Sequence, residues 1–508
     1  MSETTQPPQQ RTSWVVRTAP RVALVLALGA VVAHLSCLLF DFDHKSYGDG
    51  PILAMIERMR CEPISAAWMQ EPPYTLSCYG PAFYYVAKTV ADLGGWRSSL
   101  VPGRLVALAA TLAAAALAAV AAGRKTRSVE IGLLAALLFL VSMPVSEWVP
   151  HGRVDMLAMA CAAAAYLSVG ATTRSLVLSA VFVTAGSLAK PTLAFSAAGI
   201  GAHLLATRRY RDLVIFALTV AASGALAWGA VEYASQGFFL TAVLKGNWNP
   251  MTFWHGYFFL YMFLCCPLGA VALAATAQLL VVSPGQFVRS LYSLGFVVSL
   301  AISGVAVSKQ GADVNYFLEP ALLGSIAIAV DTVGRLRKSG GRWMALAFVG
   351  ASVVLGLPYV REVKHQLTSP PQQPAAYAMV KRYLAGEPAD VELLSDGRMV
   401  DTVLGAGHRP WLNDSYLYML LVKNGTLDLS KLLERLEDGR IKWLFLRKTA
   451  ADHKATIDCD GGCWPVEVIQ CVPRCYDLLE ANEGLWVYRH RRYRTDTAGA
   501  DHVSRNDP

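Results

Sequence analysis

Charged residues are scarce in this chain. Asp, Glu, Lys and Arg make up 16% of its 508 residues, whereas hydrophobic residues make up 54%. Because soluble globular proteins usually contain about 25% charged residues, the composition predicts a membrane protein. The net charge of +8 does not indicate nucleic-acid binding, since most basic residues stand in short runs between apolar segments, as topology signals do.

The chain also has no internal repeat, no long low-complexity segment and no small-residue cleavage site after its first apolar run. We therefore expect that run, at about 22–40, to be an uncleaved membrane span rather than a signal peptide. Residues 1–20 are polar and rich in Pro and Gln, which predicts a short disordered cytoplasmic tail.

The long apolar runs predict a polytopic α-helical membrane region over residues 21–360, with about eleven spans. The runs lie near 22–40, 102–122, 130–148, 154–170, 175–190, 192–206, 213–231, 256–283, 290–307, 316–333 and 343–360. If the N-terminus is cytoplasmic, every short loop rich in Lys or Arg falls on the cytoplasmic side. This predicts a multi-pass protein of the cytoplasmic (inner) membrane, with the loop 41–101 outside.

Residues 361–508 have the composition of an ordinary α/β domain, which the same topology places outside the cytoplasm. VELLSD, IKWLFL and GLWVYR predict short buried strands, and 426–439 predicts an amphipathic helix. In the first outer loop, 51–60 and 81–90 have the pattern of short helices that lie in the membrane interface.

Six of the ten cysteines lie in polar segments. In an oxidising compartment we expect Cys61 and Cys78 to form a disulfide that clamps the first loop. The second group is Cys459, Cys463, Cys471 and Cys475. Two disulfides are the favoured interpretation there, and a zinc site is the alternative, although the C-x₃-C spacing is not the usual one.

Ionisable and polar residues gather at the outer ends of the predicted spans, and the inner ends show little beyond topology-setting basic residues. The candidate site residues are Asp43, Tyr47, Asp49, Tyr84, His151, Arg153, Asp155, Lys190, Asn247, Asn249, Lys309, Asn315, Tyr316 and Glu319. A transporter would more often carry ionisable residues at mid-span. The one-sided distribution therefore favours an active site at the outer membrane surface.

This inventory suits the transfer of a sugar from a lipid phosphate. The phosphate leaving group needs cations rather than a general acid, and the available partners are His151, Arg153, Lys190 and Lys309. The acceptor needs one base, and an isolated carboxylate near a membrane is expected to have a raised pKa that suits this task. One base and a phosphate clamp predict inversion at the anomeric carbon.

Structural interpretations stand beside these functional ones. Asp49, between two glycines, has the pattern of a turn residue. Asp155 could serve only as the ion-pair partner of Arg153, and Lys190 could extend towards the interface without binding a ligand.

The segments SYGDGPILAMIERM and CYGPAFYYVAK resemble the first outer loop of GT-C-fold glycosyltransferases, such as protein O-mannosyltransferases and lipid A aminoarabinose transferases. The resemblance implies that Asp49 is the catalytic base and that Asp155, in GRVDMLAM, helps to form the site. SLAKPT, which contains Lys190, is similar to the Lys-Pro or Lys-Gly turn of that fold, and the resemblance implies that the stretch 309–322 contacts the lipid phosphate. Metal use stays open, because some members of that superfamily need a divalent ion.

We therefore expect a GT-C-like membrane protein with a small C-terminal extracytoplasmic α/β domain. The expected function is that of an inverting hexosyl or pentosyl transferase, which moves a sugar from a polyprenyl-phosphate donor to a glycan, lipid or protein acceptor. A lipid-linked sugar transporter or flippase, or a non-catalytic scaffold, is the alternative.

Overall fold

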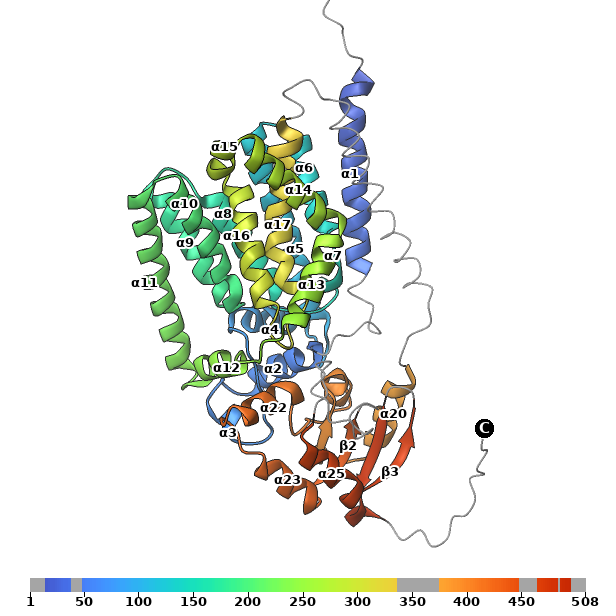
Figure 1. The fold of residues 1–508 in the computed structure, drawn as a ribbon. Coiled ribbons are helices and arrows are strands. Elements are labelled where there is room, and N and C mark those ends of the chain that lie inside the picture. The colour runs from blue at the N-terminus through green and yellow to red at the C-terminus, as the bar shows by residue number, and fades with distance from the viewer. Residues whose placement is uncertain (1–13, 38–47, 336–373, 447–463, 483–484, 495–508) are drawn as a thin grey trace, which may run out of the picture.

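The computed structural model describes residues 14–37, 48–335, 374–446, 464–482 and 485–494. A bundle of long helices forms one end of the molecule and a small sheet with its helices forms the other (Figure 1). Asp43, Tyr47, Cys459, Cys463 and the predicted span 343–360 lie outside the described residues.

Apolar helices make up the bundle. They are α1 (Trp14–Cys37), α5 (Val101–Thr126), α6 (Val129–Leu140), α8 (Asp155–Ser168), α9 (Thr173–Ser187), α10 (Ala194–Ala206), α11 (Tyr210–Ala234), α13 (Phe253–Cys265), α14 (Pro267–Val282), α15 (Pro284–Arg289), α16 (Leu291–Ala306) and α17 (Leu318–Ala327). Alanines of α5 and α8, such as Ala114, Ala118 and Ala162, are fully buried. Small side chains let these helix backbones approach closely, as is common in membrane bundles.

Three stretches of the described residues are long and apolar enough to cross a membrane: Val101–Thr126, Tyr210–Ala234 and Val314–Val333. The number rises to four if α13 and α14 form one broken span, because these helices meet at an angle of 82°. Pro267 lies at this break, and proline cannot donate the backbone hydrogen bond that would continue a helix. Several other predicted spans are shorter apolar helices, so the expected number of eleven is not confirmed.

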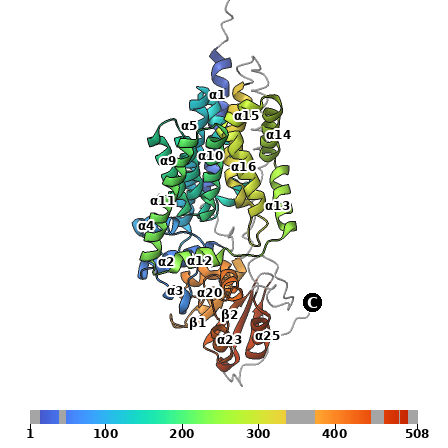
Figure 2. The ribbon, with the colours of Figure 1, turned by 60° about the vertical axis from the view of Figure 1, so that its left-hand side comes forward.

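Short helices lie between the bundle and the sheet (Figure 2). They include α2 (Asp49–Cys61), α4 (Ala82–Gly94) and α12 (Phe238–Gly246); α3 (Ala67–Gln70) and α7 (Met143–Trp148) are also short. The two helices predicted in the first outer loop thus form as α2 and α4. Buried residues of α2 and α4 pack in the same core as residues of the C-terminal part, so the loop does not lie in open solvent.

The C-terminal part contains a four-stranded sheet in the order β1-β2-β4-β3. The strands are β1 (Glu392–Ser395), β2 (Ile441–Leu446), β3 (Tyr476–Ala481) and β4 (Trp486–His490), and only the β1–β2 pair is parallel. The predicted strands correspond to β1, β2 and β4, whereas β3 was not predicted. The exposed Leu478 and Leu479 of β3 explain why it lacks a buried-strand pattern.

Helices cover both faces of this sheet, which explains why β2 is almost continuously apolar. The helices are α20 (Pro374–Leu384), α21 (Val400–Gly405), α22 (Ser415–Lys423), α23 (Ser430–Glu437) and α25 (Val466–Cys475). Trp443 and Phe445 pack with α20 and α21, while Leu444 packs with α22, α23 and α25. Residues of the first loop, including Trp68, belong to this second core, so the loop and the C-terminal part are packed as one unit.

Candidate active site

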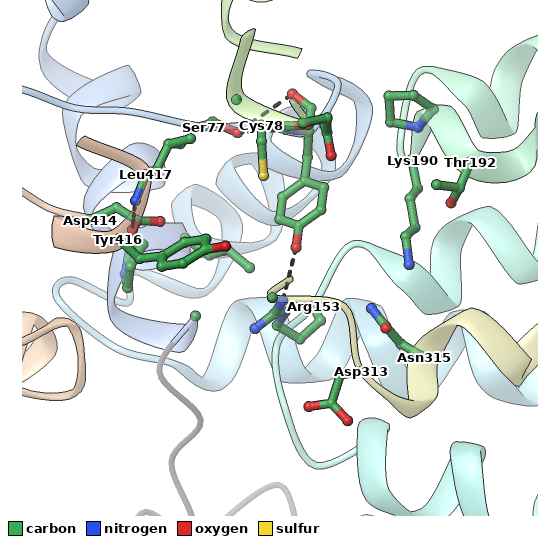
Figure 3. Close-up of a pocket in the computed structure, with 18 of the residues that line it drawn as sticks. Ser77, Cys78, Arg153, Lys190, Thr192, Asp313, Asn315, Asp414, Tyr416 and Leu417 are labelled. Carbon is green, nitrogen blue, oxygen red and sulfur yellow. Dashed lines mark hydrogen bonds between the residues drawn. The ribbon is translucent and has the colours of Figure 1, made fainter. Parts of the chain in front are cut away.

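A cavity of about 840 Å³ lies where the short helices, the ends of the bundle helices and the C-terminal part meet. Polar and charged side chains from all three regions line it: Ser77, Tyr79, Tyr84, Glu147, His151, Arg153, Lys190, Thr192, Asn247, Asn249, Lys309, Asp313, Asn315, Tyr316, Tyr377, Arg398, Asp414 and Tyr416. Figure 3 shows Lys190 and Asn315 on one side of this space and Asp414 and Tyr416 on the other.

Asp49 begins α2 and is 2% exposed. Its Oδ2 lies 3.3 Å from His151 Nδ1 and 3.9 Å from a terminal nitrogen of Arg104. Burial raises the pKa of Asp49, but His151, Arg104 and Arg153 outweigh it and lower the pKa to about 2. The expectation of a raised pKa was therefore wrong, because this carboxylate is not isolated from positive charge.

The glycines on either side of Asp49 are required by close packing. A Cβ atom on Gly48 would lie 2.0 Å from an Nη atom of Arg153, and one on Gly50 would lie 2.2 Å from the carbonyl oxygen of Gly397. Asp49 is the first residue of α2 rather than a residue at the tip of a turn. The G-D-G pattern thus lets the helix start approach both Arg153 and the C-terminal part.

Asp155 begins α8 and is fully buried. It accepts hydrogen bonds from Trp148 Nε1 at 2.8 Å, from Asn315 Nδ2 at 2.8 Å and from Lys190. Its ion-pair partner is Lys190 rather than Arg153. Among the described residues, the cavity wall includes these three donors but not Asp155, so this carboxylate orients groups that face the cavity.

Two lysines and a tyrosine form the cationic part of the cavity. The Nζ atoms of Lys190 and Lys309 lie 5.0 and 6.0 Å from the ring centre of Tyr316, within the range of cation–π attraction. Lys309 donates to Asn247 Oδ1 at 3.0 Å, and Asn247 in turn donates to the Cys78 carbonyl at 2.9 Å. Burial lowers the pKa of Lys309.

Arg153 lies beside this cluster. It donates to the Tyr79 hydroxyl at 2.9 Å, and its guanidinium lies over the rings of Trp148 and Tyr79. The buried Arg153 Nε, Asn249 Oδ1 and Asn315 Oδ1 have no hydrogen-bond partner among the described residues. Since buried polar atoms are nearly always hydrogen-bonded, three such atoms around one cavity indicate a polar ligand.

The remaining candidates differ in their position. Tyr84 lines the cavity, and its hydroxyl lies 2.7 Å from the Ser77 hydroxyl. Asn249 donates to the Gln310 carbonyl at 2.6 Å and also lines the cavity. Glu319 is buried within the bundle, where it accepts a hydrogen bond from Tyr166 at 3.1 Å, and the described cavity wall does not include it.

Several cavity residues were not predicted from the sequence. Tyr79 follows Cys78 in the CYGP segment, so the pattern that singled out this stretch could have included it. Arg398, Asp414 and Tyr416 come from the C-terminal part, more than 230 residues after Arg153 in the chain. No sequence signal connects them to the membrane helices, because only the packing of the two parts brings them to the cavity.

The expected Cys61–Cys78 disulfide is absent, since both thiols are free. Cys61 is exposed at the end of α2, whereas Cys78 lies in the cavity wall. In the second group, Cys471 and Cys475 are also free, with their sulfur atoms 3.8 Å apart one helical turn from each other.

No cluster of three or more His, Cys, Asp or Glu side chains with the spacing of a metal site occurs in the part of the chain that the structure describes. The carboxylate of Asp49 faces Arg104 and His151, and that of Asp155 faces Lys190. These cationic neighbours do not fit a divalent ion at either carboxylate.

No protein-family model and no curated protein matches this sequence. Solved structures do match it. ArnT from Cupriavidus metallidurans, bound to undecaprenyl phosphate, is similar with a TM-score of 0.61 at 12% identity, over 94% of this chain and 98% of ArnT. The apo oligosaccharyltransferase of Archaeoglobus fulgidus is similar with a TM-score of 0.57 at 11% identity, over 95% of this chain and 76% of that protein.

Both neighbours are GT-C-fold glycosyltransferases. The protein has the GT-C fold. The resemblance of its first outer loop to GT-C proteins is thus confirmed at the level of the whole chain. Within this GT-C fold, the cavity beside α2 contains the side chains that could carry chemistry, while identities of 11–12% establish the fold alone.

Proposed function

We propose that the protein is an inverting glycosyltransferase that moves a sugar from a polyprenyl-phosphate donor to an acceptor outside the cytoplasmic membrane. One observation carries this proposal. Arg153, Lys190 and Lys309 line the same cavity as His151, and Asp49 contacts His151 from behind the cavity wall. Three cations suit a phosphate, and the carboxylate–imidazole pair suits the removal of a proton from the acceptor.

The donor phosphate is held by the cationic side chains. Lys190 is fixed by Asp155, and Lys309 by Asn247, so both ammonium groups are oriented before the donor binds. As the bond from the anomeric carbon to the phosphate oxygen breaks, negative charge grows on the phosphate. Preorganised cations stabilise that charge, which removes the need for a general acid.

A second, almost wholly apolar hollow of about 340 Å³ supports a lipid-linked donor. Val183, Val220 and Trp228 line it, between α9 and α11 of the bundle. Pro191 and Leu244 belong to the walls of both the hollow and the cavity. A polyprenyl chain would enter sideways between these helices and place its phosphate near Lys190.

The structural neighbours support the same class of donor. The ArnT structure contains undecaprenyl phosphate, and the Archaeoglobus fulgidus enzyme AglB has been solved with an inhibitory peptide and a dolichol-phosphate. Both ligands are polyprenyl-type phosphates. Acceptors of several classes fit a GT-C site, so the acceptor is taken as a glycan, lipid or protein hydroxyl or amine.

Transfer of radiolabel from polyprenyl-phosphate sugars into membrane fractions tests the proposal. Membranes that contain the protein should incorporate label into an acceptor, and membranes that lack it should not. Movement of the lipid-linked sugar across liposomes without transfer would instead identify a flippase. A protein that neither transfers nor moves the sugar would be a scaffold, and the proposal would fail.

The site assignment has its own test. Asp49→Asn and Asp155→Asn should each strongly reduce transfer. The first removes the carboxylate that pairs with His151, and the second removes the ion-pair partner of Lys190. Full transfer by both variants would contradict the assignment. Gly229→Ala, on α11, is a suitable control because a Cβ atom there meets no other atom within 4 Å.

A further inference from the structure

His151 stands between Asp49 and the cavity. Its ring is part of the cavity wall, whereas Asp49, with a side chain that is 1% exposed, is not among the described residues that form the wall. The Nδ1 atom of His151 faces Asp49 Oδ2 at 3.3 Å. A substrate in the cavity therefore meets the imidazole before it can reach the carboxylate.

The carboxylate beside His151 determines which tautomer of a neutral imidazole fits this position. With a pKa of about 2, Asp49 is ionised throughout the physiological range and can only accept hydrogen bonds. In a neutral imidazole facing a carboxylate, Nδ1 therefore carries the proton, and Nε2 is the unprotonated, basic nitrogen. A carboxylate with so low a pKa is by itself a weak base.

Neighbouring side chains hold the ring in position. The rings of Trp148 and His151 meet edge to face with their centres 6.1 Å apart, and Trp148 is itself fixed by its hydrogen bond to Asp155. Charged groups near the pair include Arg104 from α5 and Arg153 from the turn before α8, and Glu147 from α7 lines the same cavity. Asp155 and Asp49 are thus connected through Trp148 and His151.

We propose that His151 is the group that accepts the proton of the acceptor, and that Asp49 is a positioning residue that orients the imidazole and stabilises its protonated form. Under the proposed function, on which this inference rests, Asp49 acts through His151 rather than on the substrate. The arrangement resembles the carboxylate–imidazole part of a catalytic triad in its logic, with the acceptor hydroxyl in place of a serine.

The reaction step balances as follows. The acceptor oxygen or nitrogen attacks the anomeric carbon with its lone pair while His151 Nε2 takes its proton. The bond from the anomeric carbon to the phosphate oxygen breaks, and its electron pair leaves with the polyprenyl phosphate. The imidazolium, paired with Asp49, later returns its proton to solvent, so neither an oxidant nor a reductant is needed.

The experiment compares three variants by their transfer from a polyprenyl-phosphate sugar: His151→Ala, His151→Gln and Asp49→Asn. The matched control is His203→Gln, because His203 is a buried histidine of α10 that is not part of the cavity wall. Removal of a general base costs roughly 10²–10⁴-fold in rate, so both His151 variants should lose that much kcat. Folding of each variant is checked by its gel-filtration profile in detergent.

Two readouts separate a proton acceptor from a structural histidine. Added imidazole should restore part of the activity of His151→Ala, and substituted imidazoles of higher pKa should restore more. Asp49→Asn should shift the acidic limb of the kcat/KM profile to lower pH, because loss of the carboxylate disfavours the imidazolium.

Two results would overturn the inference. The first is a His151→Gln enzyme that retains more than a third of wild-type kcat. The second is a His151→Ala enzyme that imidazole does not rescue, together with an Asp49→Asn enzyme that is inactive at every pH. Either result would make Asp49 the direct base and leave the proposed function intact. A wild-type protein that transfers no sugar from any polyprenyl-phosphate donor would instead remove the function and the inference together.

Discussion

Asn413, in the C-terminal part, is hydrogen-bonded to both backbone polar groups of Leu76 in the first outer loop. Asn413 Oδ1 accepts from the Leu76 amide at 2.8 Å, and its Nδ2 donates to the carbonyl oxygens of Leu76 and Pro51 at 3.1 and 3.2 Å. Asn413 is 2% exposed. Although it begins an N-x-S sequence, its burial excludes glycosylation of the folded protein.

Asn413→Ala should therefore destabilise the protein. The substitution leaves buried backbone groups of the loop without partners, and each such group costs about 1–3 kcal/mol. Thermal unfolding in detergent should show a clear fall in the midpoint. Asn424→Ala, at the other N-x-T sequence, is the matched control, because Asn424 is only partly buried and its hydrogen bonds to the Lys245 and Trp248 carbonyls are solvent-exposed, so its loss should cost less stability. Equal effects of the two changes would contradict this account of the loop.

Gly48→Ala should impair the site without unfolding the helix. The new Cβ would lie 2.0 Å from an Arg153 Nη atom, so the guanidinium must move away from Tyr79. Because a displacement of about 1 Å in a catalytic group can cost about 100-fold, we expect at least a tenfold loss of transfer. The change to alanine at Gly229 meets no neighbouring atom and should leave transfer unchanged.

Lys309 and Lys190 should respond differently to neutralisation. Lys309 is hydrogen-bonded to the neutral Asn247, so Lys309→Gln should raise KM for the donor about tenfold with little loss of stability. Lys190 is the ion-pair partner of the buried Asp155, so Lys190→Gln should also cost about 3–5 kcal/mol of stability. Donor kinetics and thermal unfolding of both variants measure the difference.

The double variant Lys190→Gln/Asp155→Asn is the control for that explanation. If an unpaired buried carboxylate causes the loss of stability, removal of its charge should restore most of it. Transfer should remain low, because the phosphate has still lost a cation. A double variant no more stable than Lys190→Gln would show that the ion pair is not the cause.

Asp49 should make the free energy of unfolding depend on pH only in the acidic range. Its pKa falls from 3.8 in the unfolded chain to about 2 in the folded protein, which corresponds to about 2 kcal/mol. Because the folded-state pKa is the lower one, this stabilisation is fully present above about pH 4 and is lost as pH falls towards 2. Between pH 5 and 2, the free energy of unfolding of wild type should therefore fall by about 2 kcal/mol more than that of Asp49→Asn. An equal fall in the two proteins would contradict the low pKa of Asp49.

The absence of the expected disulfide can be checked by thiol labelling. Cys61 is exposed and free, whereas burial raises the pKa of Cys78 to about 11. Since the thiolate is the reactive form, a maleimide should label Cys61 in the native protein and Cys78 only after unfolding. Peptide mapping by mass spectrometry distinguishes the two sites. Detection, without reduction, of a tryptic peptide that links Cys61 to Cys78 would show that the disulfide forms and would contradict this prediction.

Sequence patterns could predict the class of protein and single out candidate site segments. Low charge, long apolar runs and outer-end polar residues are local properties, so they predicted a membrane protein and drew attention to the segments around Asp49, Arg153, Lys190 and Lys309. The resemblance of the first loop correctly predicted the GT-C fold. The strands β1, β2 and β4 were predictable because they are buried on both faces, whereas the exposed β3 was not.

The stretch that begins at Asp49 could be located from its sequence, but its chemistry could not. Only tertiary structure brings His151, 102 residues away, to 3.3 Å from Asp49, and Arg104 to its other side. Those contacts lower a pKa that the sequence alone predicted to be raised. Only packing shows that Lys190, and not Arg153, is the ion-pair partner of Asp155, and that Cys61 and Cys78 are free. Charge and pKa depend on neighbours in space, which a pattern along the chain does not contain.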